Sequence, residues 1–158
     1  MDGQPDSRGA VGSVGFDVGD RLAIINLFGA YAYTYDENRL DEFRTLFTDS
    51  PELVLVHEGH PLSADIDTVM GLLAARKASF KAENNQRRHA LNSFWFDSQS
   101  ATEATGRCYF QVFAIKDGGP PAPDLTGCYE FTAVKQDGAW RFGRWVVAID
   151  QRQAGTRE

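Results

Sequence analysis

Residues 125–149 read LTGCYEFTAVKQDGAWRFGRWVVAI, and their pattern decides the fold class. Apolar and polar residues alternate on both sides of Asp137-Gly138, as they do in strands that bury one face. Both positions of an Asp-Gly pair tolerate positive φ, which the tight turn of a hairpin requires. The stretch therefore predicts two antiparallel strands, 125–134 and 140–149, joined by a two-residue turn.

Upstream of this hairpin the chain predicts two further strands, 89–96 and 102–115. Before them the chain predicts two helices, over 20–35 and 40–47, then a short strand over 52–56 and a turn over 58–61. A third helix follows over about 65–80. Helices followed by a four-stranded antiparallel meander indicate an α+β fold with the helices on one face of a curved sheet.

The bulk properties indicate one globular domain. The chain has 158 residues, 42% of them hydrophobic, and a formal net charge of −6. Its basic residues form no stripe that could follow a phosphate backbone, so we expect no nucleic-acid partner. No apolar run approaches the roughly 20 residues of a membrane span. We predict a flexible leader over 1–14, a single domain over 15–150, a polar tail over 151–158, and a soluble cytoplasmic protein.

Two features that could suggest metal or redox chemistry have simpler explanations. Cys108 and Cys128 fall in neighbouring predicted strands without a CxxC pattern, and we expect two reduced thiols. His57 and His60 have an HxxH spacing, but the glycine and proline around them indicate a turn rather than a helix. The sequence therefore predicts no metal site and no cofactor.

The first predicted helix ends in an acid. Residues at spacings of three and four draw one line along it: Leu22, Ile25, Gly29, Ala32, Tyr33 and Asp36. If this line faces the sheet, burial disfavours the charged carboxylate and suits Asp36 to acid–base chemistry near neutral pH. Alternatively, Asp36 only caps the next helix. Tyr33 lies three residues earlier on the same side, so its hydroxyl could reach the same space. Tyr31 and Tyr35 diverge somewhat from that line, and core packing explains any one of the three tyrosines equally well.

His89 opens the first strand of the meander. Alternation places it on one face with Leu91, Ser93 and Trp95. If the helices cover that face, an imidazole shares an enclosed cavity with Asp36, and His is well suited to move protons at neutral pH. The alternative is a structural histidine that only forms hydrogen bonds.

The later strands supply the walls of this cavity. The candidate substrate-binding residues are Trp95, Leu91, Tyr129, Phe110, Cys108 and Glu130. Glu130 has two alternatives, because it either faces solvent on the open side of the sheet or adds a second carboxylate to the pocket.

These pieces together resemble the SnoaL-like polyketide cyclase and scytalone-dehydratase-like branch of the nuclear-transport-factor-two-like superfamily. The resemblance spans about residues 18–149 and is carried by Ala32-Tyr33-Thr34-Tyr35-Asp36, Leu40-Asp41-Glu42-Phe43, Arg88-His89 with Asn92, Gly127-Cys128-Tyr129 and Asp137-Gly138-Ala139-Trp140-Arg141-Phe142. It implies a cone-shaped α+β barrel, with three N-terminal helices packed on a strongly curved, mainly antiparallel sheet that encloses a pocket.

In scytalone-dehydratase-like members a Tyr–Asp pair at the end of the first helix and a strand histidine line that pocket. In this sequence the corresponding residues are Tyr35, Asp36 and His89. The sequence departs from the dehydratases at Cys108-Tyr109, where they have another histidine. It departs again near Tyr129, where they have a polar amide, so a two-histidine dehydration mechanism is not implied.

The expected function is cofactor-independent acid–base chemistry on a small, largely apolar secondary metabolite such as a polyketide or prenylated aromatic. The reaction would be a cyclisation, isomerisation or dehydration, with epoxide-opening ring closure as a special case. The catalytic residues would be His89, Asp36, Tyr35 and Tyr33. The alternatives are a non-catalytic ligand-binding or dimerisation module and a small structural subunit of a larger enzyme. Exposed aromatic residues on the sheet predict a homodimer.

Overall fold

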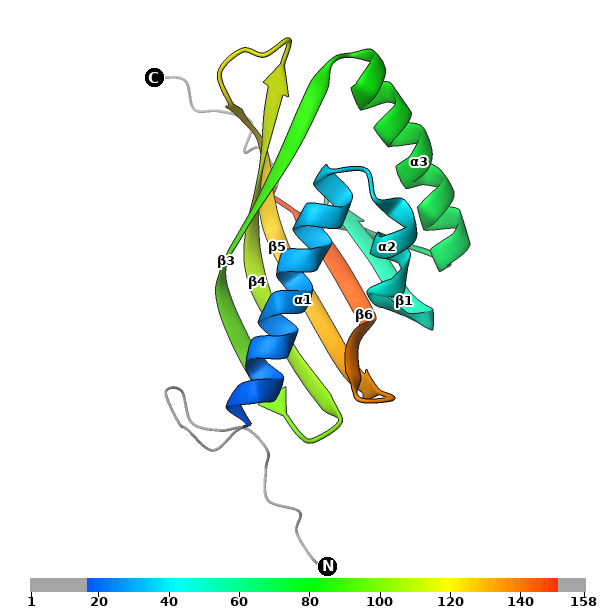
Figure 1. Cartoon of the computed structure of the whole chain (residues 1–158), viewed down its shortest axis with the longest axis vertical. Coiled ribbons are helices and arrows are strands. Elements are labelled where there is room, and N and C mark those ends of the chain that lie inside the picture. The colour runs from blue at the N-terminus through cyan, green and yellow to red at the C-terminus, as the bar shows by residue number, and fades with distance from the viewer. Residues whose placement is uncertain (1–16, 151–158) are drawn as a thin grey trace, which may run out of the picture.

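The computed structural model describes residues 17–150 and contains three helices and six strands (Figure 1). In chain order they are α1 (Val18–Asp36), α2 (Leu40–Thr45), β1 (Phe47–His57), β2 (His60–Ala64), α3 (Ile66–Ala82), β3 (Asn85–Gln99), β4 (Glu103–Lys116), β5 (Ala122–Gln136) and β6 (Ala139–Ile149). The predicted leader (1–14) and tail (151–158) lie outside the described residues. Within the described part of the chain, no helix is long and apolar enough to cross a membrane.

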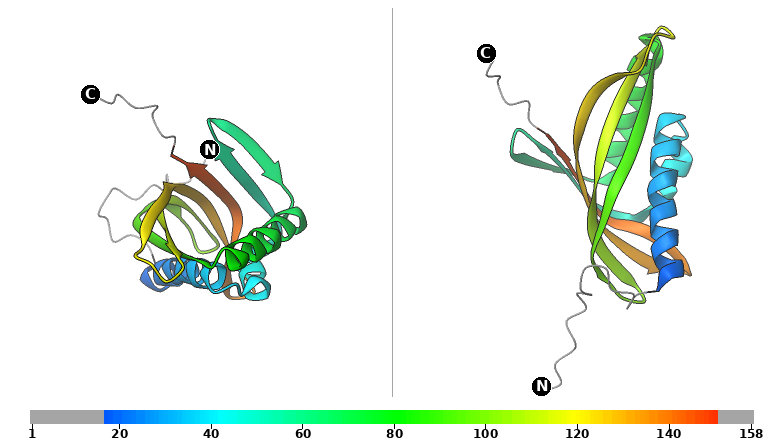
Figure 2. Two further views of the ribbon diagram at one scale, coloured as in Figure 1. Left: turned by 90° about the horizontal axis from the view of Figure 1, so that it is seen from above. Right: turned by 90° about the vertical axis from the view of Figure 1, so that its left-hand side faces the viewer.

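The strands form one curled sheet in the order β2-β1-β6-β5-β4-β3. All neighbours are antiparallel except β1 and β6, which run parallel. Figure 2 shows the three helices on the concave side of the sheet, which curls around them without closing. The α+β class and the mainly antiparallel, strongly curved sheet are confirmed, and the sheet remains open rather than forming a closed barrel.

Turn chemistry explains where the hairpins form. Asp137 and Gly138 both have positive φ, at 51° and 77°, which confirms the predicted turn between β5 and β6. Glu58 and Gly59 also have positive φ, at 51° and 75°, in the turn between β1 and β2. The sequence indicated a turn extending to Pro61, but β2 begins at His60, and Pro61 is accommodated because β2 is an edge strand.

The start of α1 is capped by Asp17 and carries an acid, Asp20, in its first turn. Asp17 is the N-cap, and its Oδ1 accepts a hydrogen bond from the backbone N of Asp20 at 2.7 Å. Asp20 instead accepts hydrogen bonds from Trp140 Nε1 and Lys135 Nζ, both at 2.9 Å. These bonds join the beginning of α1 to the β5–β6 hairpin.

The buried side of α1 also differs from the predicted line. Leu22 is 61% exposed and Tyr33 is 72% exposed. The buried residues are Ile24, Leu27, Phe28, Tyr31, Thr34 and Tyr35. The predicted line passed through Gly29 and Ala32, which have little apolar surface, whereas the observed side buries one phenylalanine and two tyrosines. Burial of large aromatic side chains outweighs the alignment of small ones.

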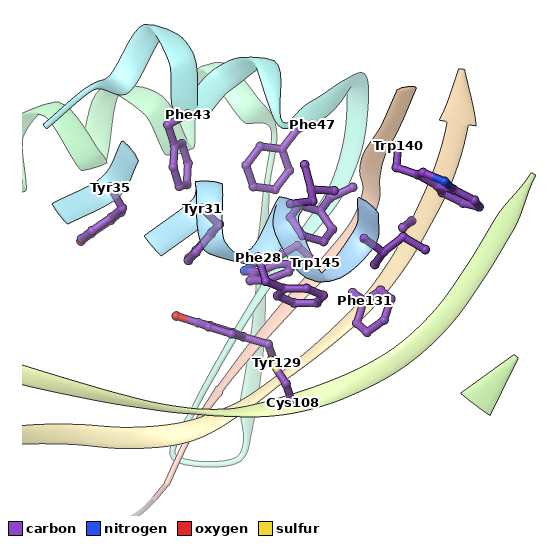
Figure 3. Packing of buried hydrophobic residues seen from close by; sticks show 14 of the residues in the cluster. Phe28, Tyr31, Tyr35, Phe43, Phe47, Cys108, Tyr129, Phe131, Trp140 and Trp145 are labelled. Atoms are coloured by element: carbon purple, nitrogen blue, oxygen red, sulfur yellow. The ribbon is translucent and has the colours of Figure 1, made fainter. Parts of the chain in front are cut away.

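Phe28 lies at the centre of an aromatic core (Figure 3). Its ring contacts Phe131, Phe142 and Trp145 at centroid distances of 4.9, 5.1 and 5.4 Å. Phe94 from β3 completes the cluster at 5.1 Å. This core fills one end of the curled sheet and leaves the other end for a cavity.

The close approach of β5 to its neighbours requires glycine at 127. A Cβ at this position would lie 2.2 Å from the carbonyl oxygen of Ala148 and 2.6 Å from ring carbons of Phe110. We expect Gly127→Ala to lower the free energy of unfolding by roughly 2–3 kcal/mol, because backbone and ring must both shift. Urea unfolding measures this loss. Gly71→Ala is the matched control, since a Cβ there meets nothing within 4 Å, and an equal effect in both variants would contradict the prediction.

Candidate active site

A cavity of about 370 Å³ lies between the helices and the concave face of the sheet. This volume falls in the range of small-molecule sites in proteins. All three helices and all six strands contribute to its lining, which is mainly aliphatic and aromatic: Tyr31, Tyr35, Phe43, Phe47, Leu53, Val54, Leu55, Leu62, Ser63, Ala64, Ile66, Val69, Leu72, Leu73, Arg76, Phe80, Arg87, His89, Phe110, Val112, Leu125, Tyr129, Trp145, Val147 and Ile149. An apolar ligand with few polar groups suits such a lining.

His89 reaches this cavity from β3 and is held by the last residue of α1. Its Nδ1 lies 2.6 Å from Asp36 Oδ1, and its backbone N donates to Asp36 Oδ2 at 2.8 Å. The side chains are 8% and 6% exposed. The structure thus brings the strand imidazole and the helix-end carboxylate together, although only His89 lines the cavity. The alternative that Asp36 caps the next helix is wrong, because the N-cap of α2 is Arg39.

The pairing determines which imidazole nitrogen is available for chemistry. An ionised carboxylate can only accept hydrogen bonds, so Nδ1 carries the proton that bridges to Asp36. In the neutral ring Nε2 is then the basic nitrogen, and among residues 17–150 it has no hydrogen-bond partner. His89 lines the cavity, so this arrangement can accept a proton from a bound molecule, while the carboxylate stabilises the imidazolium.

Three tyrosines surround the imidazole or face it across the cavity. The Tyr35 ring packs against His89 edge-to-face at 4.7 Å, and Tyr31 lies 6.4 Å away. Tyr129 reaches toward the helix tyrosines from β5, 5.5 Å from Tyr31 (Figure 3). Burial raises the pKa of all three phenols, so they remain protonated and can donate hydrogen bonds.

Three cations border the same end of the cavity. Arg76 and Arg87 line it, and their guanidinium carbons lie 5.7 and 4.8 Å from the centroid of the Phe80 ring. Lys77 Nζ lies 3.9 Å from the centroid of the Tyr35 ring. Burial lowers the pKa of Lys77 to about 8, although the negative charge of Asp36 opposes this shift.

Lys77 makes stability depend on pH. Between about pH 8 and 10.5 the folded protein binds fewer protons than the unfolded chain. The buried charge of Lys77 therefore destabilises the fold most below pH 8, and the free energy of unfolding increases as the pH rises from 8 to 10.5. We expect Lys77→Met to be more stable than the native chain at pH 7, on the order of 1–3 kcal/mol, and to lose that advantage near pH 10.5.

Urea unfolding at pH 7 and pH 10 measures this difference. Lys81→Met is the matched control, because Lys81 is exposed on the same helix. A stability difference that is the same at both pH values would refute the assignment to Lys77.

Three of the predicted site residues face solvent: Tyr33, Trp95 and Glu130. Tyr33 lies on the outer side of α1, away from the cavity. Trp95 is 48% exposed, and its Nε1 donates to Asp97. The pairing of β3 with β4 shifts register between Asn92 and Trp95, and Ser93 has a φ of 56°. This bulge reverses the alternation, so the side chains of Phe94 and Phe96 enter the core and that of Trp95 does not.

The remaining predicted wall residues divide into two groups. Phe110 and Tyr129 line the cavity as expected. Leu91 and Cys108 belong to the packed core rather than to the lining, and the Glu130 side chain is 51% exposed beside Arg144, so its solvent-facing alternative is correct. Residues 107–113 and 128–132 alternate without interruption, but the curl of the sheet decides which inward residues meet empty space.

Among the polar residues that border the site, sequence reasoning missed Tyr31, Arg76, Lys77 and Arg87. The signals for both arginines were present. Arg87 shares the strand face of His89, two positions away. Arg76 follows Val69, Leu72 and Leu73 at helical spacing.

Neither cysteine is paired. Cys108 and Cys128 are free thiols, and burial raises the pKa of Cys108 to about 12, so that thiol stays protonated. Within residues 17–150, no group of three or more His, Cys, Asp or Glu side chains is arranged to hold a metal ion.

Comparison with known proteins identifies the family of the chain. The sequence matches the profile of the SnoaL-like domain over residues 17–146, which is most of the chain. The chain belongs to the SnoaL-like family. No curated protein matches the sequence.

Several solved structures have a similar fold. ActVI-ORFA from Streptomyces coelicolor is similar to this chain with a TM-score of 0.74 at 18% identity, covering 87% of this chain and 99% of that one. A proposed scytalone dehydratase from Novosphingobium aromaticivorans has a TM-score of 0.69 at 22% identity, covering 89% and 91%. The β-subunit of a proposed aromatic-ring-hydroxylating dioxygenase from the same organism has 0.67 at 21%, covering 89% and 97%. At these identities the likeness shows the fold. This SnoaL-like fold is suited to catalysis or to ligand binding.

Proposed function

We propose that this SnoaL-like protein is a cofactor-independent acid–base enzyme that cyclises, isomerises or dehydrates a small, largely apolar metabolite. The observation that carries the proposal is His89 in the wall of an apolar cavity, with its Nδ1 bound to the Asp36 carboxylate and its Nε2 without a protein partner among the described residues. Polyketides and prenylated aromatics are molecules of suitable size and polarity.

His89 is the proton-transfer group in this proposal. Its Nε2 takes a proton from the bound molecule, and the electron pair left behind forms the new bond or double bond. Asp36 acts as a positioning residue, because both of its carboxylate oxygens are occupied by His89. It holds the ring in one tautomer and offsets the positive charge that develops on it.

The tyrosines stabilise oxygen atoms of the substrate. Tyr35 adjoins the imidazole, while Tyr31 and Tyr129 line the cavity beside it. Protonated phenols aimed at an oxygen that gains negative charge lower the barrier, because they are already oriented in a site with little water. Tyr31 and Tyr129 thus take the place first expected for Tyr33, which faces solvent.

Epoxide-opening ring closure is one reaction that uses all of these groups. Nε2 removes the proton of a substrate hydroxyl, the oxygen attacks an epoxide carbon, and the carbon–oxygen bond of the epoxide breaks. A tyrosine hydroxyl hydrogen-bonds the departing oxygen, which then receives the proton held by His89. Atoms and charge balance without a metal or an oxidant.

The experiment is a turnover assay of the purified chain on a panel of apolar aromatic compounds with an epoxide and a hydroxyl, or with a β-hydroxy ketone. Mass spectrometry detects loss of water, and chromatography detects isomers. Turnover by the native chain that disappears on substitution of His89 supports the proposal. Binding of panel members without any turnover contradicts it.

A non-catalytic binding or dimerisation module is the second candidate. The outer face of the sheet exposes Trp95 and Tyr109, and apolar surface of this kind is typical of contact sites. The dioxygenase β-subunit described above has the same fold. The predicted homodimer is tested by the mass of the native chain in solution, compared with that of Tyr109→Lys.

A further inference from the structure

We propose that Arg76 and Arg87 form a carboxylate-binding subsite at one end of the cavity, so that the ligand is an apolar molecule with a single carboxylate. This inference rests on the proposed function in one respect, because it assumes that the ligand of the cavity is the substrate. It names the class of that substrate, an aromatic or polycyclic monoacid.

The two arginines come from different elements and meet at one aromatic ring. Arg76 projects from α3 and Arg87 from β3, and both guanidinium groups lie against Phe80. A guanidinium that packs on an aromatic ring retains N–H groups in its own plane, where they can bind a carboxylate in bidentate fashion. Both residues line the cavity.

The two arginines differ in their protein partners. Arg87 is 6% exposed and forms an ion pair with Asp124. Arg76 is exposed, and among residues 17–150 it has no carboxylate partner. Arg87 is thus fixed in the wall, while Arg76 retains its hydrogen-bonding capacity for a ligand.

The charges at this end of the cavity do not balance. Arg76, Lys77, Arg87 and Arg88 supply four positive charges near neutral pH, and Asp36, Glu37 and Asp124 supply three negative charges. One positive charge remains next to an apolar space. A ligand with one carboxylate neutralises it and buries its hydrocarbon body in the same step.

The same charges act near the proposed catalytic group. Burial raises the pKa of Tyr35, and the charges of Arg76 and Arg87 oppose this shift. The Tyr35 ring packs on His89 at 4.7 Å. A carboxylate held by the arginines is therefore anchored on the Tyr35 side of the cavity, which fixes the distance between the anchored end of the substrate and Nε2.

The test uses two ligands of the same shape, 2-naphthylacetate and 2-naphthylacetamide, with calorimetric titration at low ionic strength. The native chain should bind the acid more tightly than the amide by about tenfold or more, since charged hydrogen bonds contribute on that scale. Arg76→Gln should remove this preference and leave amide binding unchanged. Lys81→Gln, which removes one positive charge from the same helix outside the cavity, should keep it.

Three results would overturn the subsite: equal affinity of the native chain for both ligands, an acid preference that survives Arg76→Gln, or no binding of either ligand at millimolar concentration. The affinity measurement needs no turnover, so it tests the subsite separately from the proposed catalysis. If the acid preference holds but no compound is turned over, the proposed catalysis fails and the subsite stands.

Discussion

Replacing His89 by Gln is expected to lower kcat by about 10²–10⁴-fold, the usual contribution of a positioned general base. The glutamine can still donate a hydrogen bond from its side chain to Asp36, and the backbone N of residue 89 keeps its own bond to Asp36 Oδ2. Only the basic nitrogen in the cavity is lost. Steady-state kinetics with a substrate from the panel measures the change.

The control for this variant is His57→Gln. His57 is exposed at the end of β1 and does not line the cavity. Its replacement should leave kcat and KM unchanged. Equal turnover by His89→Gln and the native chain, with both fully folded, would remove His89 from the mechanism.

Asp36→Asn should lower kcat by about a hundredfold or more, for a reason that concerns the tautomer of His89. An asparagine amide that donates to Nδ1 forces the ring proton onto Nε2, so the nitrogen in the cavity becomes a donor and can no longer take a proton. The side-chain oxygen of the asparagine can still accept a hydrogen bond from the backbone N of His89, so the fold should be retained.

Nitrogen NMR of the imidazole distinguishes this effect from a general structural one. The native chain should show the proton on Nδ1, and Asp36→Asn should move it to Nε2. Glu37→Gln is the matched control, because Glu37 is the next residue and pairs outward with Arg88. An unchanged tautomer in Asp36→Asn together with full activity would show that the carboxylate does not position His89.

The main features of the fold were predictable because local chemistry determines them. Asp137-Gly138 specifies its turn, and alternation over 125–149 specifies the strands on either side. The Asp36–His89 pair was also predictable, since Asp36 ends a helix that was identified correctly and His89 belongs to a predicted strand, although β3 begins at Asn85 rather than at His89. β2 was missed because a five-residue edge strand containing Pro61 has no strong strand signal.

The details that failed depend on tertiary structure. Trp95 was assigned to the wrong face because the bulge at Ser93 adds a residue, and no local signal in the sequence marks it. Tyr33 was preferred to Tyr31 because small residues gave a clear helical line, while the fold buries the larger rings. Which inward-facing residues line empty space, such as Phe110 but not Cys108, is decided by the curl of the whole sheet.

The parallel pairing of β1 with β6 has a consequence for how the protein folds. Strands β3 to β6 are joined to their neighbours by short connections. In contrast, β1 pairs with β6, and β2, α3 and β3 to β5 lie between these two strands in the chain. Closing so long a loop costs entropy before any contact compensates for it. The meander can therefore nucleate first, and the hairpin of β1 and β2 docks late. We therefore expect the side of the cavity that β1 and β2 form to be completed last.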